Sequence, residues 1–353
     1  MDSTTMSKKE LRALRQQQKK EEALRRIKTR DKLPFWMLIR YKYCTLYFAK
    51  KLGLAIFRLV LLIGLSYVIL FPYISKIFNS FMGREDFVDV TVLLIAKYPT
   101  LDTYKAIIES NHYFRALLNS TTIALMCATL QMLVCTLVGY GFAKFNFKFR
   151  KLLFVLVIFT MIVPHETLQL SLFMKFRYFD IWGIGGAVSK LFGGSWDGFN
   201  LLNTNWPLAI MSLTCLGLKN GLYIYIMRQY FNGVPDELEE AAYVDGASVY
   251  KTFMKIILPM STTMLVTIFM FAFAWQWSDM FYTGLFYTGK HDTLLPDIIK
   301  IPTVLDTQYA AQSAYESAIR NTSGLLILAP LVVLYLFAQR TMIEGVERSG
   351  ITG

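Results

Sequence analysis

Residue patterns that mark a nucleotide-binding or catalytic protein are missing from this sequence. The phosphate-binding pattern G-x-x-x-x-G-K-[ST] occurs nowhere in its 353 residues, so the chain does not bind ATP through a P-loop. Histidine is scarce, and His112, His165 and His291 are too scattered to form a metal site. Paired carboxylates and Ser/His/Asp sets are not placed together either. These absences disfavour an enzyme, and they predict no cofactor or metal ion in this chain.

Cysteine is almost as scarce, with four residues in the whole chain. None belongs to a CxxC pair; Cys127, Cys135 and Cys215 lie in apolar runs, and Cys44 is the fourth. Small buried side chains are therefore expected rather than disulfides or metal ligands. The chain also shows no convincing internal repeat. This absence disfavours a self-sufficient secondary carrier, because such carriers usually contain two matching halves.

Apolar residues, by contrast, are abundant. They make up 54% of the chain, and the mean hydropathy is +0.40. Several apolar runs exceed the roughly 18–20 residues needed to cross a bilayer. The expected spans are about 54–77, 117–143, 152–174, 207–230, 260–281 and 323–337. The sequence therefore predicts an all-α integral membrane protein with six transmembrane helices.

Positive charge sets the expected orientation. The net charge is +12, and residues 1–51 contribute +10 of it, with 15 Lys and Arg against 5 Asp and Glu. A basic segment beside a first span fits the positive-inside rule and attraction to anionic membrane lipid better than binding to nucleic acid. A basic turn at 144–151 and Arg228 mark further inner ends. Both termini are therefore predicted in the cytoplasm. The expected parts are a basic extension with an interfacial helix (1–50), a six-span domain (51–342) and a cytoplasmic tail (343–353).

An acidic stretch, residues 234–259, interrupts the apolar runs between the fourth and fifth spans. It reads VPDELEEAAYVDGASVYKTFMKIILP. Pro235 is well placed as the first residue of a helix, and the carboxylates after it oppose the helix dipole favourably. Gly246 tolerates the left-handed conformation that ends a helix, and a second helix over 247–257 should stop near Pro259. The prediction is a helix-bend-helix, which fits either an ordinary acidic loop or a knob offered to a partner protein.

The spacing within this stretch is similar to a known signature. It resembles the EAA loop of permease subunits of binding-protein-dependent ABC importers. The matching residues are Glu240, Ala241, Ala242, Gly246, Ile256, Leu258 and Pro259. Asp245, Ala247 and Phe253 resemble the version found in carbohydrate-uptake permeases, whereas Thr263 stands where many relatives carry a second proline. The resemblance covers roughly residues 55–353 and leaves out the basic extension.

The resemblance implies a permease subunit in a bacterial plasma membrane, forming half of a pathway for a sugar, with an oligosaccharide favoured. The implied partners are a second homologous permease, two ABC ATPase subunits that bind the ATP and Mg, and an extracellular sugar-binding protein. The implied ATPase-coupling residues are Glu239, Glu240, Ala241, Ala242, Asp245, Gly246, Ala247, Ile256, Leu258 and Pro259. The C-terminal tail resembles that of maltose-type permeases, which reaches between the ATPase subunits. This likeness implies ATPase contacts at Gly345, Ser349, Gly350 and Gly353.

Two polar clusters within the predicted spans are candidates for lining the pathway. Pro164, His165 and Glu166 lie midway along the third span, where ionisable residues are costly and face protein or water. The competing interpretation is a proline-broken helix whose freed carbonyls pair with a neighbour. Gln276 and Asp279 lie in WQWSDMF, which resembles the family's Trp-Asn-x-Phe region with Gln276 in place of Asn. These groups could bind a sugar, or the tryptophans could form an aromatic belt at the outer interface.

The alternatives are also transport proteins. One is a permease of the same superfamily that carries a non-sugar solute. The others are a homodimeric channel and a secondary carrier, both of which would work without an ATPase.

Overall fold

The computed structural model describes residues 46–181, 183–194, 198–288, 294–308 and 311–351, without the side chains of 46–49 and 344–351. Within these ranges the regular secondary structure is helical, and the β-type contact is an isolated bridge between Phe179 and Phe199. The predicted all-α class is therefore confirmed. The basic residues 1–45 and Gly353 lie outside the described residues. The chain divides into two units, residues 1–75 and 76–353, each described by itself below.

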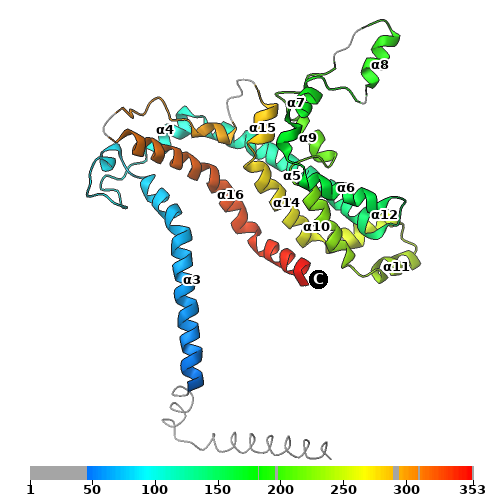
Figure 1. Ribbon diagram of the computed structural model, residues 1–353, viewed down its shortest axis with the longest axis horizontal. Coiled ribbons are helices and arrows are strands. Elements are labelled where there is room, and N and C mark those ends of the chain that lie inside the picture. The colour runs from blue at the N-terminus through cyan, green and yellow to red at the C-terminus, as the bar shows by residue number, and fades with distance from the viewer. Residues whose placement is uncertain (1–45, 182, 195–197, 289–293, 309–310, 352–353) are drawn as a thin grey trace, which may run out of the picture. The chain divides into compact units, whose positions relative to one another are not determined.

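The first unit is represented by helix α3, Leu46–Asn79, whose end from Lys76 onward belongs to the second unit (Figure 1). Its segment Lys50–Asn79 is long and apolar enough to cross a membrane, and the most apolar part has no buried side chain. A helix that is apolar and exposed on all sides needs lipid or another protein around it. α3 therefore fits the first span predicted at 54–77, although the helix begins earlier.

Four segments of the second unit fit predicted spans. Helices α5 (Tyr113–Lys144) and α16 (Gln312–Ile351) each contain a continuous apolar segment of spanning length. The other two segments are bent. α6 (Arg150–Ile162) turns by 97° into η2 (His165–Leu168) and α7 (Gln169–Arg177), and the helical run Val249–Met260 turns by 75° into α14 (Thr262–Trp277). The described residues thus contain three helices able to span a membrane, or up to five if each bent pair is one span.

The fourth predicted span, 207–230, is not one continuous helix. It consists of α9 (Trp206–Leu213) and α10 (Asn220–Asn232), separated by six residues. Cys215 and Lys219 adopt left-handed backbone angles in this break, with φ of 60° and 63°. Gly217 allows the break to pack closely, because a Cβ there would lie 2.8 Å from Nε2 of Gln131 on α5. Hydropathy predicted one span because the break is itself mostly apolar, so composition does not reveal it.

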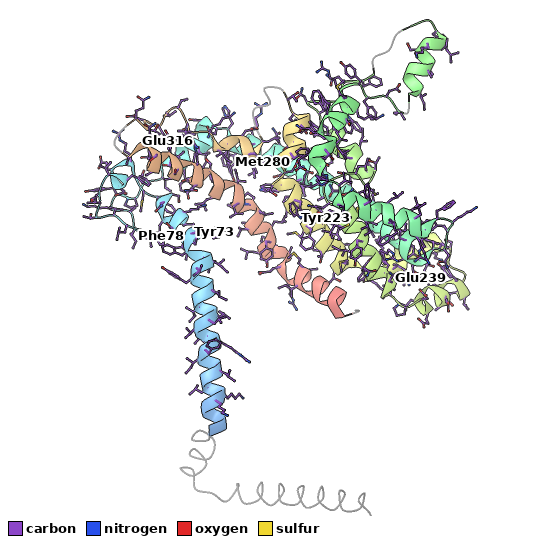
Figure 2. All side chains as sticks on the ribbon, in the orientation of Figure 1. Tyr73, Phe78, Tyr223, Glu239, Met280 and Glu316 are labelled. Carbon is purple, nitrogen blue, oxygen red and sulfur yellow. The ribbon has the colours of Figure 1, made fainter. Side chains whose placement is uncertain are left out.

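Helix α5 lies at the centre of the second unit, with α9, α10 and α14 packed on it (Figure 1). α10 approaches it most closely at Gly139, where a Cβ would lie 2.6 Å from the Cβ of Met227. Tyr223 of α10 is fully buried in this core (Figure 2). Cys127 and Cys135 of α5 are buried as predicted, whereas Cys215 is half-buried. A glycine and small side chains on α5 therefore let two helices pack close together.

Shorter helices lie between these elements. They are η1 (Arg84–Phe87), α4 (Asp102–Ser110), α8 (Ile184–Leu191), α11 (Glu237–Val244), α15 (Phe281–Phe286) and η4 (Leu295–Ile299). α4 and α11 lie at opposite ends of the second unit (Figure 1). The segment predicted as a polar C-terminal tail continues α16 as helix through Gly345, Ser349 and Gly350 to Ile351. The predicted contacts of these residues with an ATPase remain a prediction.

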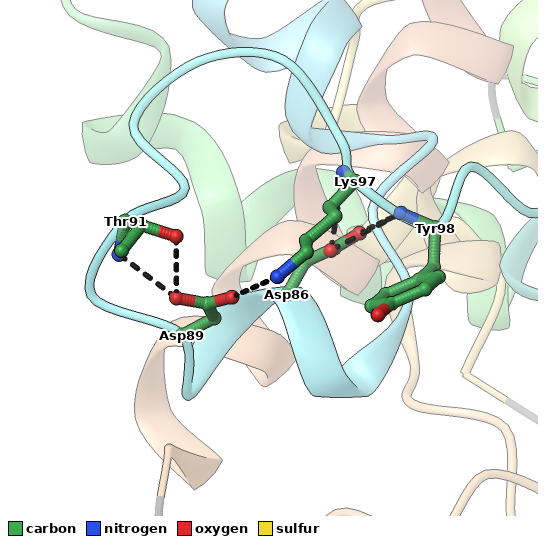
Figure 3. A network of polar contacts seen from close by, with 5 residues as sticks. All are labelled: Asp86, Asp89, Thr91, Lys97 and Tyr98. Atoms are coloured by element: carbon green, nitrogen blue, oxygen red, sulfur yellow. Dashed lines mark hydrogen bonds and ion pairs between the residues drawn. The ribbon is translucent and has the colours of Figure 1, made fainter.

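A network of polar contacts holds the segment that follows α3 (Figure 3). The Asp86 carboxylate is 3% exposed and accepts backbone N–H groups of Gly83 at 3.2 Å, Lys97 at 3.2 Å and Tyr98 at 3.3 Å. Asp89 accepts the backbone N–H of Thr91 at 2.9 Å and its hydroxyl at 2.7 Å. The Lys97 ammonium donates a hydrogen bond to the Asp89 carboxylate at 3.1 Å. Two carboxylates thus fix an irregular segment that has few backbone hydrogen bonds of its own.

This network predicts a pH response of the segment. Hydrogen bonds from Thr91 and then from Lys97 lower the pKa of Asp89 to about 2, and Asp89 raises the pKa of Lys97 above 10.5. The contribution of Asp89 to the folded segment is therefore complete above its ordinary pKa of 3.8 and is lost as the pH falls towards about 2. The carboxyl carbon shift of Asp89, followed by NMR, should titrate near 2. Lys97→Met should move that midpoint towards 3.8, and the control Lys105→Met should not. A wild-type midpoint of 3.8 would contradict the prediction.

Candidate functional site

The acidic stretch forms the predicted helix-bend-helix. Helix α11 begins at Glu237, two residues after Pro235, and ends at Val244. Gly246 has φ of +77°, which confirms its left-handed conformation. The N–H of Ala247 donates to the carbonyl of Ala242 at 2.9 Å, which satisfies a carbonyl at the end of α11. Ser248 then starts the second arm, because its hydroxyl accepts the N–H of Lys251 at 3.3 Å.

The second arm of the bend continues past the predicted proline stop. α12 (Val249–Thr252), the π-helical η3 (Phe253–Ile257) and α13 (Leu258–Met260) follow one another without a gap. Pro259 has no N–H for the carbonyl four residues before it, and the widened π turn directly precedes this defect. The helix ends one residue after Pro259, where the chain bends into α14. Proline therefore marks the joint between knob and span, as expected.

Burial divides the predicted coupling residues into two groups. Glu240, Ala241, Asp245, Gly246 and Pro259 are exposed, and Ala247, Ile256 and Leu258 are half-buried. Ala242 and Glu239 are buried, at 6% and 7% exposure. Figure 2 labels Glu239 on α11 at one end of the unit. Its Oε1 is buried without a hydrogen-bond partner among the described residues. Glu239 therefore faces the protein's own interior, and Glu240 is the carboxylate available to a partner.

Apolar side chains are also exposed along the bend that carries Glu240. Val244 is 88% exposed and Tyr250 is 72% exposed. Further exposed apolar residues of the stretch are Leu238, Tyr243, Val249 and Met254. An exposed apolar patch with a polar rim is typical of a protein–protein contact. This patch favours the partner-binding interpretation of the stretch over an ordinary acidic loop.

The bend is anchored to the C-terminal end of α5. Lys144, whose side chain is 6% exposed, donates to the carbonyl of Val234 at 2.6 Å and to the Asp236 carboxylate at 2.5 Å. The Tyr140 ring lies 4.6 Å from that of Phe253 and 5.4 Å from that of Phe231, measured between centroids. One end of α5 thus contacts the chain before the bend and the arm after it. These contacts fix the bend to the central helix.

A cavity of about 420 Å³ lies where three helical runs are interrupted. The interruptions follow α6 at Val163, α9 at Leu213 and α14 at Trp277. The lining is mostly apolar, and its polar members are Thr160, His165, Cys215, Lys219, Asn220 and Tyr282. The Tyr282 hydroxyl lies 2.9 Å from Nδ1 of His165, which joins the first break to the third. In membrane proteins, irregular backbone occurs where it is buried or lines a cavity, and discontinuous helices often build the binding site.

The candidate pathway residues have different surroundings. His165 lines this cavity, and Pro164 is exposed at the break as the N-cap of η2. Glu166 is exposed and lines a neighbouring hollow beside Phe281. Asp279 is buried and accepts the N–H groups of Phe281, Tyr282 and Thr283 at 2.9–3.1 Å. Asp279 therefore begins α15 as a cap and has little capacity left for a sugar.

The tryptophans of this region are also of two kinds. Trp277 is buried, and its Nε1 donates to the carbonyl of Ile327 on α16 at 3.1 Å, so it does not belong to an outer aromatic belt. Trp275 is 47% exposed. Gln276 is buried, and its Nε2 has no hydrogen-bond partner among the described residues.

Lys219, Asn220 and Tyr282 were not among the candidates that the sequence suggested, although a lysine within an apolar run was a visible signal.

Comparison with known proteins decides the family. The sequence profile of the binding-protein-dependent transport system inner membrane components matches residues 135–343, which include the helix breaks and the acidic bend. This chain belongs to that family. It is therefore an integral inner membrane permease of an ABC transport system rather than a catalytic enzyme, and its family works with ATPase and substrate-binding components. Membership decides against a self-sufficient channel or secondary carrier.

Individual relatives agree with this assignment. The galactooligosaccharides transport system permease protein GanQ of Bacillus subtilis is 25% identical over 301 residues, covering 84% of this chain and 95% of the relative. The maltodextrin transport system permease protein MalD of Streptococcus pneumoniae is 26% identical over 292 residues, covering 83% and 93%. The osmoprotective compounds uptake permease protein GgtD of Synechocystis is 28% identical over 295 residues, covering 81% and 89%.

A solved structure shares the fold. A chain of a bacterial ABC transporter involved in the import of the acidic polysaccharide alginate aligns with a TM-score of 0.62 and 17% identity. The alignment covers 82% of this chain and 97% of that chain. At this identity the likeness concerns the fold alone.

Proposed function

We propose that this permease forms half of the pathway for a sugar, with an oligosaccharide favoured, that an extracellular binding protein delivers. A second homologous permease supplies the other half, and two ABC ATPase subunits bind the ATP and Mg. The anchored bend at 234–260 carries this proposal, because it combines an exposed carboxylate and apolar patch with a fixed connection to α5. The names of the galactooligosaccharide and maltodextrin relatives support a sugar as the substrate.

The proposed coupling is mechanical. Closure of the ATPase subunits displaces the knob, and Lys144 and Tyr140 pass the displacement to α5. α5 packs against α9, α10 and α14, and residues of α9 and α10 line the cavity, so its movement opens or closes the pathway. Such a switch needs a stiff element with different contacts in its two positions. Contacts of the tail at 343–353 with the ATPase pair belong to the same proposal.

The proposed topology has six spans with both termini in the cytoplasm. The parts are the basic extension 1–50, the permease domain 51–342 with the coupling loop 234–259, and the tail. Each bent pair then counts as one span, and α9 with α10 forms the fourth. The basic turn at 144–151 and the opposite positions of α4 and α11 support this arrangement.

Purification of the tagged chain from native membranes in mild detergent tests the proposal. We expect an ABC ATPase and a second permease to co-purify with it. The reconstituted complex with its binding protein should hydrolyse ATP faster when the sugar is present. Purification of the chain without any ATPase, under conditions that keep membrane complexes intact, would overturn the proposal.

Import of a small osmoprotective solute is the second candidate function, favoured by the relative from Synechocystis. A panel of both solute classes, tested by thermal shift on the binding protein, separates the two.

Gly246→Ala is expected to weaken coupling through backbone strain alone. No atom lies within 4 Å of a Cβ added at Gly246, so the substitution meets no steric clash. The left-handed conformation itself costs alanine about 1–2 kcal/mol, which changes the angle or population of the bend. Substrate-stimulated ATPase activity and uptake should fall about 5- to 30-fold at that cost. Gly246→Asn is the matched control, since asparagine tolerates this conformation. Equal activity of the alanine variant and the wild type would contradict the prediction.

A further inference from the structure

The break between α9 and α10 places a lysine at the cavity. Lys219 is the N-cap of α10, in a left-handed conformation with φ of 63°. Its position is midway along the proposed fourth span, where an ammonium group is costly unless it serves a function. The coupling mechanism does not use this charge.

The charge of Lys219 has no carboxylate partner. Its Nζ lies 4.8 Å from the centroid of the Trp275 ring, and no acidic group lies within salt-bridge distance among the described residues. Asp279 accepts three backbone N–H groups of α15, and Glu166 lines the neighbouring hollow. Lys219 therefore lines the cavity with a positive charge that no acidic group of the described residues neutralises.

Neutral polar atoms beside Lys219 are also incompletely paired. Asn220, which lines the cavity, is 1% exposed, and its Oδ1 has no hydrogen-bond partner among the described residues, whereas its Nδ2 donates to the carbonyl of Ser212 at 3.3 Å. A buried amide oxygen without a donor is costly, and a ligand hydroxyl can supply the missing donor. His165 and Tyr282, which hydrogen-bond to each other, add two further polar groups to the lining. An ammonium, an amide, an imidazole and a phenol group thus line one volume.

We propose that this cavity binds a saccharide that carries an anionic group, and that Lys219 recognises the anion. The Lys219 ammonium forms an ion pair with a carboxylate or sulfate of the saccharide, and Asn220 Oδ1 accepts a hydrogen bond from a sugar hydroxyl. The face of the Trp275 ring lies beside the ammonium. A volume of about 420 Å³ is within the usual range of ligand pockets and admits one or two sugar units of a longer chain. The proposal rests on the proposed function, and it narrows the substrate from sugars in general to acidic sugars.

Matched saccharides test the substrate class first. The cognate binding protein is screened by thermal shift with trigalacturonate, a sulfated galactotriose and neutral galactotriose, which differ in the anionic group. The proposal expects stabilisation by an acidic probe, and the probe that acts distinguishes carboxylate from sulfate. Stabilisation by the neutral trisaccharide alone overturns the proposal and leaves the proposed function standing. Stabilisation by no saccharide overturns the proposal together with the sugar assignment.

Substitutions then test the role of Lys219 in the assembled transporter, reconstituted in proteoliposomes. Lys219→Asn removes the charge but keeps a residue that tolerates the left-handed backbone. It should lower the ratio of acidic to neutral saccharide uptake by about 10- to 100-fold, the loss expected for a hydrogen bond to a charged group. Lys219→Arg should keep most of the preference. Lys190→Asn, at an exposed lysine of α8, is the control and should not change the ratio.

Assembly is checked separately by co-purification of the second permease, so that misfolding is not mistaken for altered specificity. An unchanged uptake ratio in correctly assembled Lys219→Asn overturns the role of this residue. A preference of the wild-type transporter for the neutral saccharide also overturns the role of Lys219.

Discussion

Glu240→Lys is expected to abolish co-purification of the ATPase subunits while the chain still inserts into the membrane. Glu240 is exposed on α11 and its carboxylate has no ion-pair or hydrogen-bond partner among the described residues, so its charge is available to a partner. Breaking a buried charge pair across an interface costs about 2–5 kcal/mol, which lowers affinity roughly 30- to 5,000-fold. The measurement is the ratio of ATPase to permease after affinity purification in mild detergent.

Asp102→Lys is the matched control for this experiment. Asp102 is also exposed near the N-terminus of a helix, α4, so its reversal changes net charge and helix dipole in the same way. α4 lies at the end of the unit opposite α11, away from the proposed ATPase contact (Figure 1). The control should keep the wild-type ratio. A wild-type ratio in Glu240→Lys itself would refute the assignment of this carboxylate to the ATPase contact.

Lys144→Met is expected to separate ATP hydrolysis from uptake. The methionine keeps the length of the side chain but cannot donate to Val234 or pair with Asp236. The loss of one hydrogen bond from a charged donor costs about 1.5–3 kcal/mol, and it leaves the Val234 carbonyl without its 2.6 Å contact. The knob then moves without carrying α5 with it. Sugar imported per ATP hydrolysed should fall about 10-fold or more at this cost, although the ATPase still binds through Glu240.

The control and readout make this prediction specific. Lys151→Met removes an exposed lysine of α6 from the same basic turn and should leave the uptake-to-hydrolysis ratio unchanged. Equal losses of uptake and hydrolysis in Lys144→Met would indicate failed assembly, and co-purification of the ATPase excludes that case. An unchanged ratio in an assembled complex would show that Lys144 does not transmit the motion.

Local signals were strong enough to predict the bend at 234–259. Glycine adopts positive φ without penalty, and proline lacks the N–H that continues a helix, so Gly246 and Pro259 constrain the backbone without tertiary contacts. The helical class also followed from apolar length, because backbone groups in lipid must be paired within the segment. The long helices α3, α5 and α16 match the spans that the sequence predicted most simply.

Discontinuities within spans were predicted less well. The break at Pro164 had a sequence marker, but the break at 214–219 had none strong enough to outweigh the surrounding apolar residues. Its left-handed residues are a cysteine and a lysine, types that rarely signal such a conformation. Gly217 and the buried amides of Gln131 and Asn220 stabilise the break through contacts between helices. Contacts of this kind join residues about 80 positions apart, and no local pattern encodes them.

The sequence alone determined that this protein crosses a membrane as helices and that it presents an acidic bend between two spans, because apolar length, glycine and proline act locally. The tertiary structure decided which of those residues can act. It buried Glu239 and left Glu240 exposed. It also engaged Asp279 in capping α15 and anchored the bend to α5 through Lys144. It also brought three helix breaks together around Lys219. Burial and partnership depend on which helices pack together, and that packing is a property of the whole fold.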